Sequence, residues 1–186
     1  METRRGPGRL ELTGLLAWSM ALSALGIDLI LPAFTHMRAD LGLEPDSTAL
    51  AGLITAYFFG LAGGQLLYGP VSDRYGRRPA LYAGLLVYAI GALAGALAPN
   101  LALLYVARFV WGLGAAGPRV VTQAVIRDTY EGDAMAKAMS LVMAVFLLVP
   151  IVAPSIGAAA VEAGSWRWIF LGCVGASLVI AVWASV

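Results

Sequence analysis

Asp28, Arg108 and Arg119 are the charged residues that lie well inside long apolar segments of this sequence. At bilayer depth each such charge costs at least ~2.5–3.5 kcal/mol, so it needs a compensating role. Asp28 lies about five residues, and Arg108 about seven, from the same face of the apolar layer, so their depths differ by only ~3 Å. We expect them to face each other across a central cavity. A carboxylate held between apolar surroundings and a guanidinium can exchange a proton and compete with a cationic substrate.

Structural explanations exist for the same three charges. Asp28 could instead cap or pin a neighbouring helix, and Arg108 could extend its guanidinium to the nearer membrane surface. Arg119 lies about five residues from the opposite surface, and there we favour such snorkelling. The uncharged polar residues of the apolar segments that could line a cavity are Tyr57, Gln65 and Gln123. Buried Tyr and Gln also serve simply to bond across helices.

Several function classes are excluded by composition. The sequence has one cysteine, Cys173, and one histidine, His36, so neither an internal disulfide nor a metal site is indicated. His36 falls in a predicted external loop, which leaves no catalytic triad, and we expect no enzyme. Gly112–Gly117 matches G-x-G-x-x-G, but it lacks the preceding strand that a dinucleotide site requires. With 12 Lys+Arg against 11 Asp+Glu, nucleic-acid binding is not expected.

Six apolar segments must position these side chains. Only 12% of the 186 residues are charged, about half the share of an ordinary soluble domain. Each segment has the ~20 residues needed to cross a bilayer, and in lipid such segments form helices because every backbone group must be bonded internally. Gly60-x-x-x-Gly64 and Gly91-x-x-x-Gly95 predict faces of close helix packing. The predicted spans are approximately 12–33, 48–68, 80–98, 101–124, 138–161 and 166–186.

The basic residues predict the orientation of these spans. An excess of Lys and Arg marks the cytoplasmic side of a membrane protein. The tail of residues 1–11 and two of the loops carry most of them, whereas the opposite side has Arg38 and Arg167 among several acidic residues. We therefore expect the N-terminus to be cytoplasmic. The residues on that side are Arg4, Arg5, Arg9, Arg74, Arg77, Arg78, Arg127 and Lys137.

The segment from Gly69 to Pro79, between the second and third spans, fits the pattern G-x-x-x-D-R-x-G-R-R. This pattern resembles the loop signature of the major facilitator superfamily. Arg108–Gly112 is similar to the R-x-x-x-G element of that family, whose arginine is implicated in proton coupling. In the fifth span Pro150, Pro154 and Gly157 resemble the motif of its antiporters, although Ala153 and Ala158 depart from the usual G-P-x-x-G-G form.

Further segments resemble the bicyclomycin-resistance (Bcr/CflA) branch of multidrug exporters: Asp28–Ala33, Arg127-Asp128 and Trp166–Phe170. The resemblance implies an all-α membrane protein, here the six-helix N-terminal bundle, a 3+3 inverted repeat, with the C-terminal half absent. It also implies proton-coupled efflux of drugs or other lipophilic molecules across a bacterial inner membrane, driven by the proton gradient without a cofactor. The alternatives are a proton-coupled uptake permease for a sugar or metabolite, and a half-size transporter that dimerises.

The loop pattern has a physical interpretation of its own. Gly69 and Gly76 would allow close helix approach and a tight reversal. Asp73 would meet a helix N-terminus or an arginine of the other half, a contact that the family resemblance implies latches the cytoplasmic gate. Arg74, Arg77 and Arg78 would hold lipid phosphates or gate carboxylates. The alternative, a plain basic anchor, explains the arginines but not the glycines and the aspartate.

Overall fold

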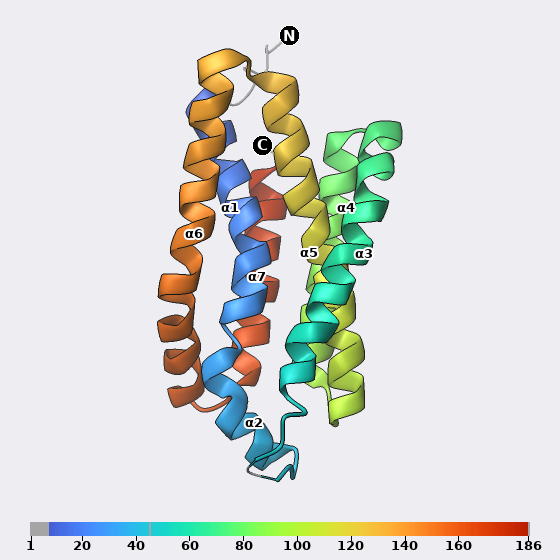
Figure 1. Cartoon of the computed structure of the whole chain (residues 1–186), viewed down its shortest axis with the longest axis vertical. Coiled ribbons are helices and arrows are strands. Elements are labelled where there is room, and N and C mark those ends of the chain that lie inside the picture. Colours follow the sequence, from blue (N-terminus) through green and yellow to red (C-terminus); the bar gives the residue numbers. More distant parts are fainter. Residues whose placement is uncertain (1–7, 45, 186) are drawn as a thin grey trace.

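The computed structural model describes residues 8–44 and 46–185. Arg4, Arg5 and Val186, which entered the predictions above, lie outside the described residues. The described chain is a bundle of roughly parallel and antiparallel helices, with α2 at the opposite end from the first turn of α1 (Figure 1). In order the elements are α1 (Arg9–Asp28), the 3-10 turn η1 (Leu31–Ala33), α2 (Phe34–Asp40), α3 (Ala51–Tyr75), α4 (Arg77–Leu97), α5 (Leu101–Thr129), α6 (Gly132–Glu162) and α7 (Arg167–Trp183).

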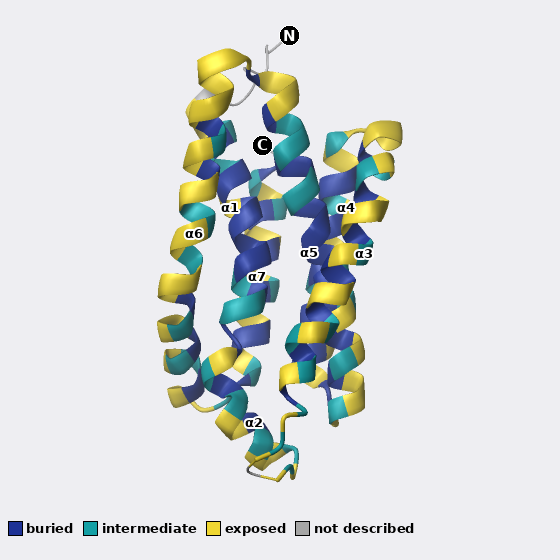
Figure 2. Ribbon diagram, viewed as in Figure 1, coloured by how far each residue is buried: buried dark blue, intermediate teal, exposed yellow. Residues whose placement is uncertain are grey.

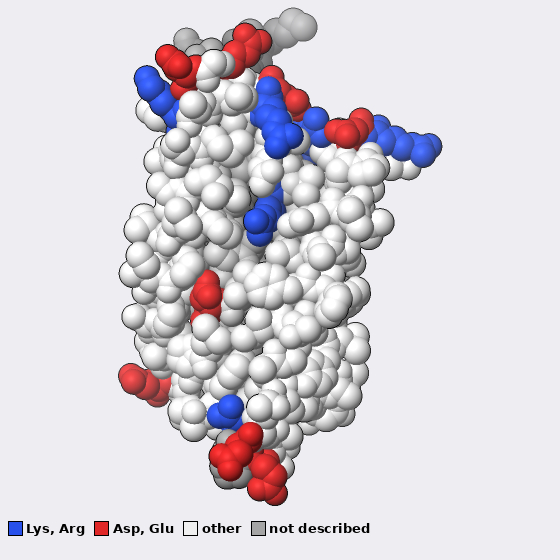
Figure 3. Space-filling view, in the orientation of Figure 1, with Lys and Arg blue, Asp and Glu red and all other residues white. Residues whose placement is uncertain are grey.

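The helices have the length and composition of membrane spans. Within the described residues five helical segments are long and apolar enough to cross a membrane, and α7 is a shorter apolar helix of 17 residues. Each predicted apolar segment overlaps one of these helices. Charged side chains gather at the two ends of the molecule, and the apolar body between them is interrupted by an acidic and a basic spot (Figure 3).

α5 is the helix that makes the most extensive contacts with the other helices. It lies against both α3 and α4, and the contacts are made through glycines. A Cβ on Gly60 of α3 would overlap the carbonyl oxygen of Phe109, and one on Gly112 of α5 would overlap that of Tyr57. On α4, Gly91 packs in the same way against the backbone of Trp111. Figure 2 shows the result as buried surface along α1 and α5, with the outer face of α6 exposed.

α1 ends at Asp28, about five residues before the end of the predicted span 12–33. Pro32 cannot donate the backbone hydrogen bond that would continue the helix to Asp28, and proline disfavours the helical conformation of the residue before it. The chain therefore passes from α1 through η1 into α2. α2 occupies part of the predicted external loop, so the placement of His36 in a loop was wrong: it is an exposed residue of α2.

The reversal between α3 and α4 is confined to one residue. The sequence predicted a turn over residues 69–79, but α3 runs to Tyr75 and α4 begins at Arg77. Gly76 alone lies between them, with φ 93° and ψ 164°, a conformation that only glycine adopts without strain. The tight reversal expected at Gly76 is therefore present. Gly69 is different, because an added Cβ there meets nothing within 4 Å, and it supports no close approach.

Candidate functional site

Arg108 is completely buried between α1, α3 and α5, with 0% of its surface exposed. Its Nη1 donates to the carbonyl oxygen of Gly26 at 2.7 Å, and its Nε donates to that of Leu53 at 3.3 Å. The rings of Tyr57 and Trp111 have their centroids 4.7 and 4.9 Å from the guanidinium carbon, positions that favour a cation. Arg108 therefore does not extend to the membrane surface.

The position of Gly26 explains why this arginine can be held there. The last four carbonyl groups of a helix have no partner within the helix, and Gly26 lies among the last residues of α1. A cation at a helix C-terminus also interacts favourably with the helix dipole. Arg108 thus supplies, from α5, a charged cap for the interrupted end of α1. Its Nη2 has no hydrogen-bond partner among the described residues.

Asp28, the last residue of α1, is half-buried. The expected ion pair with Arg108 is absent: among the described residues the salt bridges are Arg77–Asp73, Arg77–Asp128 and Arg167–Asp40. Two donors of Arg108, Nε and Nη1, bond backbone carbonyls instead. The two charges nevertheless lie close in depth, because Arg108 bonds to Gly26, two residues or ~3 Å along the axis from Asp28. The Asp28 side chain makes no hydrogen bond in the described structure, so it does not pin a neighbouring helix.

The three uncharged candidates have different environments. Tyr57 is fully buried, and its hydroxyl donates to the carbonyl oxygen of Ser23 at 2.9 Å, so it belongs to the core rather than to an open cavity. Gln65 is exposed on α3, and Gln123 is partly exposed on α5. Arg119 is also partly exposed on α5, with its guanidinium 5.4 Å from the ring centroid of Phe146 on α6.

Two residues of the site were missed by the sequence analysis. Gly26 contributes a carbonyl and also the space for Tyr57, because a Cβ there would lie 2.5 Å from the tyrosine hydroxyl. Trp111 is buried, and its ring packs edge-on against those of Tyr57 and Tyr88. The signal that could have located the arginine's partner was Pro32, because a proline predicts the end of a helix and hence unpaired carbonyls.

In the antiporter-like motif of α6, Gly157 packs against the residues that follow the end of α1. A Cβ on Gly157 would overlap the carbonyl oxygen of Leu29 and lie 3.4 Å from Pro32. Pro154 is partly exposed and Pro150 exposed, and α6 remains helical through both. The end of α1 is therefore enclosed from one side by Arg108 and from the other by Gly157.

The loop motif forms a charge cluster within this chain. Arg77 donates to Asp73 at 2.6 Å, to Asp128 of α5 at 2.8 Å and to the hydroxyl of Ser72 at 2.7 Å. Within this chain the partner of Asp73 is Arg77, and the contact expected with the other half stays a prediction. Asp128 was expected after the fourth span but lies in the last turn of α5.

The other two arginines of the motif also have contacts within this chain. Arg78 donates to the carbonyl oxygen of Ala184 at 2.9 Å, and so caps the C-terminal end of α7. The guanidinium of Arg74 lies 5.3 Å from the ring centroid of Tyr75. The motif therefore ties together the ends of α3, α4, α5 and α7.

We expect Arg77→Gln to lower the free energy of unfolding by no more than about 1 kcal/mol, because its ion pairs are exposed and such pairs contribute ~0–1 kcal/mol. The side chains of Arg77, Asp73 and Asp128 are 31%, 70% and 52% exposed. Denaturant titration in detergent micelles measures the change, with Arg74→Gln as the control that breaks no ion pair. A loss of several kcal/mol would contradict the exposed geometry of this cluster.

Comparison with known proteins decides the family. Residues 16–186 match the Major Facilitator Superfamily. The chain belongs to this superfamily. Members of the major facilitator superfamily are transporters, and the expected fold class of an all-α, multi-pass membrane bundle is confirmed.

Relatives within the superfamily include proteins named for drug resistance. The chain is 34% identical to a bicyclomycin resistance protein homolog of Haemophilus influenzae, over 87% of this chain and 41% of that protein. It is 35% identical to a chloramphenicol resistance protein of Pseudomonas aeruginosa, over 84% of this chain and 38% of that protein. An uncharacterized MFS-type transporter of Bacillus subtilis, YdgK, is 36% identical over 95% of this chain and 44% of its own length.

A solved structure gives the same fold. The D-xylose–proton symporter superimposes with a TM-score of 0.80 at 14% identity, over 95% of this chain and 47% of the symporter. At that identity the similarity concerns the fold alone. The chain spans less than half the length of the curated relatives described above, which is consistent with the predicted N-terminal half.

Proposed function

We propose that this chain is the N-terminal half of a proton-coupled exporter of drugs or other lipophilic small molecules. The proposal places it in a bacterial inner membrane with its N-terminus in the cytoplasm. Two relatives are named for resistance to bicyclomycin and chloramphenicol, which favours efflux. The observation that carries the mechanism is a fully buried arginine, Arg108, held at the end of α1 beside the half-buried Asp28.

In this mechanism Asp28 is the proton carrier and Arg108 positions it. A lipophilic compound, in many cases a cation, enters a cavity open to the cytoplasm, and the two halves then rock around it. Protonation of Asp28 from the outside neutralises the carboxylate and releases the compound. The Nη2 group of Arg108 has no partner in the described structure, so in this mechanism it is the donor that bonds the deprotonated Asp28 when the end of α1 moves. The proton gradient is the driving force, and no cofactor takes part.

The remaining half of the transporter is the principal partner in this proposal. In their most apolar windows α3 and α6 are only 33% and 17% buried, whereas the segment containing α1 is 61% buried. The exposed helices offer their faces to a C-terminal half, or to a second copy of this chain, and to the lipid bilayer. The substrate and the proton would pass between the halves.

The test is proton release evoked by chloramphenicol from the purified full-length protein in detergent. We expect wild type to release protons and Asp28→Asn to release none, because asparagine cannot carry the coupling proton. Asp46→Asn is the matched control, since Asp46 is an exposed acid outside the helices. Unchanged release from Asp28→Asn would exclude this carboxylate as the carrier. Proton-coupled uptake of xylose by the same protein in proteoliposomes, with no response to the drug, would favour the permease alternative.

A further inference from the structure

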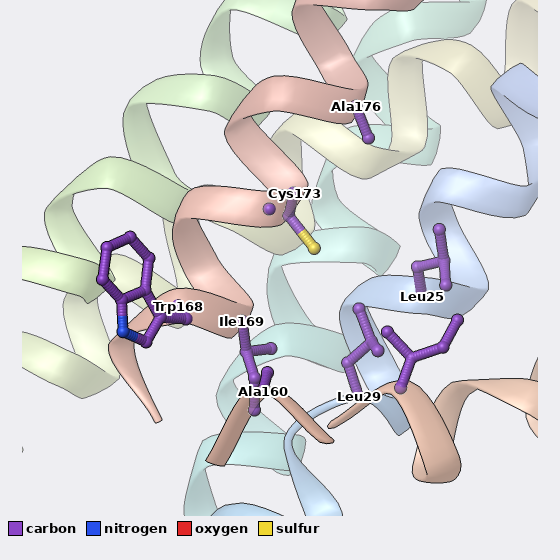
Figure 4. Close-up of a pocket in the computed structure, with 9 residues that line it drawn as sticks. Leu25, Leu29, Ala160, Trp168, Ile169, Cys173 and Ala176 are labelled. Atoms are coloured by element: carbon purple, nitrogen blue, oxygen red, sulfur yellow. The ribbon is translucent and has the colours of Figure 1, made fainter. Parts of the chain in front are cut away.

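An apolar slot lies between α1, α6 and α7, and no part of the coupling mechanism uses it (Figure 4). Its volume is about 210 Å³. Figure 4 shows the sulfur of Cys173 directed from α7 toward Leu25 of α1 and Leu29, which follows that helix, on the opposite wall. The residues that α7 contributes are Trp168, Ile169, Gly172, Cys173 and Ala176.

The slot is elongated along the helices. Trp168, Gly172 and Ala176 follow one another at intervals of four residues, so they lie on one face of α7 and span ~12 Å of its axis. Leu25 near the end of α1 and Leu29, the residue that follows that helix, form a shorter facing stripe of ~6 Å. The space between these stripes therefore runs along the direction in which lipid chains lie in a bilayer. Its width results from the absence of large side chains at the glycine and alanine positions.

The slot has a buried floor and an exposed rim. Cys173, Ile169 and Leu29 are only 2%, 3% and 6% exposed, whereas Trp168 and Ile156 at the edge are 55% and 51% exposed. No charged residue lines it. A space of this kind is accessible to a hydrocarbon group from the membrane and offers nothing to bind a polar one.

One end of the slot lies at a membrane interface. Trp168 is in the first turn of α7, next to Arg167, and tryptophan and arginine at the end of a span are typical of the headgroup level. Arg167 also lies 3.8 Å from Asp40 of α2 and donates to the Ala98 carbonyl at 3.3 Å. The slot therefore extends from the headgroup level near α2 into the apolar layer.

We infer that this slot holds one acyl chain of a phospholipid from the leaflet nearest α2, with the headgroup at the level of Arg167 and Trp168. Pockets that enclose a whole drug-sized molecule have volumes of ~300–1,000 Å³ and a few polar groups that orient the ligand; this slot is smaller and entirely apolar. A bound chain would restore van der Waals contact between α1 and α7. The inference depends on the chain spanning a membrane and not on the proposed export.

The experiment uses full-length protein in liposomes of phosphatidylcholine that carries a diazirine in the middle of one acyl chain. After irradiation and proteolysis, mass spectrometry should find lipid adducts on Cys173 and Leu29, although both are buried from the outer surface. We expect Gly172→Leu to lower the yield of these adducts roughly tenfold, because the new side chain occupies the volume of the acyl chain.

Gly175→Leu is the matched control. Both glycines are exposed on α7, and an added Cβ at either meets nothing within 4 Å, but only Gly172 lines the slot. We expect this control to give the wild-type yield of lipid adducts on Cys173 and Leu29. Absence of adducts on Cys173 and Leu29 in wild type, or their persistence in Gly172→Leu, would overturn the inference. Selective loss of these adducts on addition of tetraphenylphosphonium would assign the slot to a lipophilic solute instead and would overturn it too.

Discussion

Arg108→Met in the full-length protein is expected to lower drug-evoked proton release roughly tenfold to a hundredfold, since a bond to a charged group contributes ~1.5–3 kcal/mol and 1.4 kcal/mol is tenfold. Arg108 is a buried cation that bonds the carbonyl of Gly26, two residues before Asp28, and its Nη2 group has no partner in the described structure. Methionine fills a similar volume without charge, and replacing a buried charge in this way need not unfold a protein. The measurement is proton release at saturating drug, together with drug binding.

The control for this prediction is Arg119→Met. Arg119 is also an arginine of α5 inside a predicted span, but it is partly exposed and its described contact is with the ring of Phe146. We expect it to keep wild-type proton release. Proton release by Arg108→Lys should lie between that of Arg108→Met and that of Arg119→Met, because an ammonium keeps the charge but lacks the planar donor geometry. Wild-type release from Arg108→Met would show that this arginine only stabilises the end of α1.

Gly60→Ala and Gly63→Ala, three residues apart on α3, are expected to change stability in opposite directions. The added Cβ at Gly60 would overlap the Phe109 carbonyl oxygen, a backbone atom that cannot rotate away. The two helices must then separate, with a loss of about 3 kcal/mol in the free energy of unfolding. At Gly63 the nearest atom to the new Cβ is Leu113 Cδ1, 4.0 Å away. There alanine should stabilise the helix by ~0.5–1 kcal/mol.

Unfolding by sodium dodecyl sulfate in mixed micelles measures both changes in the same assay. Gly112→Ala, on the facing side of the contact, should behave like Gly60→Ala, because its Cβ would overlap the Tyr57 carbonyl. If Gly60→Ala and Gly63→Ala had the same effect, α3 and α5 could not be in backbone contact at this height. The close packing on which the position of Arg108 depends would then be wrong.

Local patterns predicted the helices and much of their packing. The apolar segments coincide with helices because segment length and composition alone decide whether a chain can cross a bilayer. The paired glycines at Gly60 and Gly64, and at Gly91 and Gly95, were predicted to face other helices. At each of them an added Cβ would collide with α5 or with Phe170 of α7.

The ends of the helices were predicted less well from the sequence. Predicted spans end where apolar residues end, but the helices continue through the charged residues of the loop motif until Gly76 and to Thr129 in α5. This difference has a simple cause: apolarity is required by the membrane, whereas a helix outside it needs only its backbone bonds and tolerates charged side chains. The turn predicted for the motif residues was therefore wrong, because all of them except Gly76 are helical.

The sequence by itself determined that Asp28 and Arg108 lie at similar depth, because rise per residue converts position in a span into height. Only the tertiary structure decided what Arg108 bonds. Its partners are the carbonyls of Gly26 and Leu53 on two other helices. Pro32 indicates that carbonyls near the end of α1 are unpaired, but residue types cannot show which carbonyl lies next to an arginine of another helix. That depends on where α1 ends and on how closely the glycines allow α3 and α5 to approach.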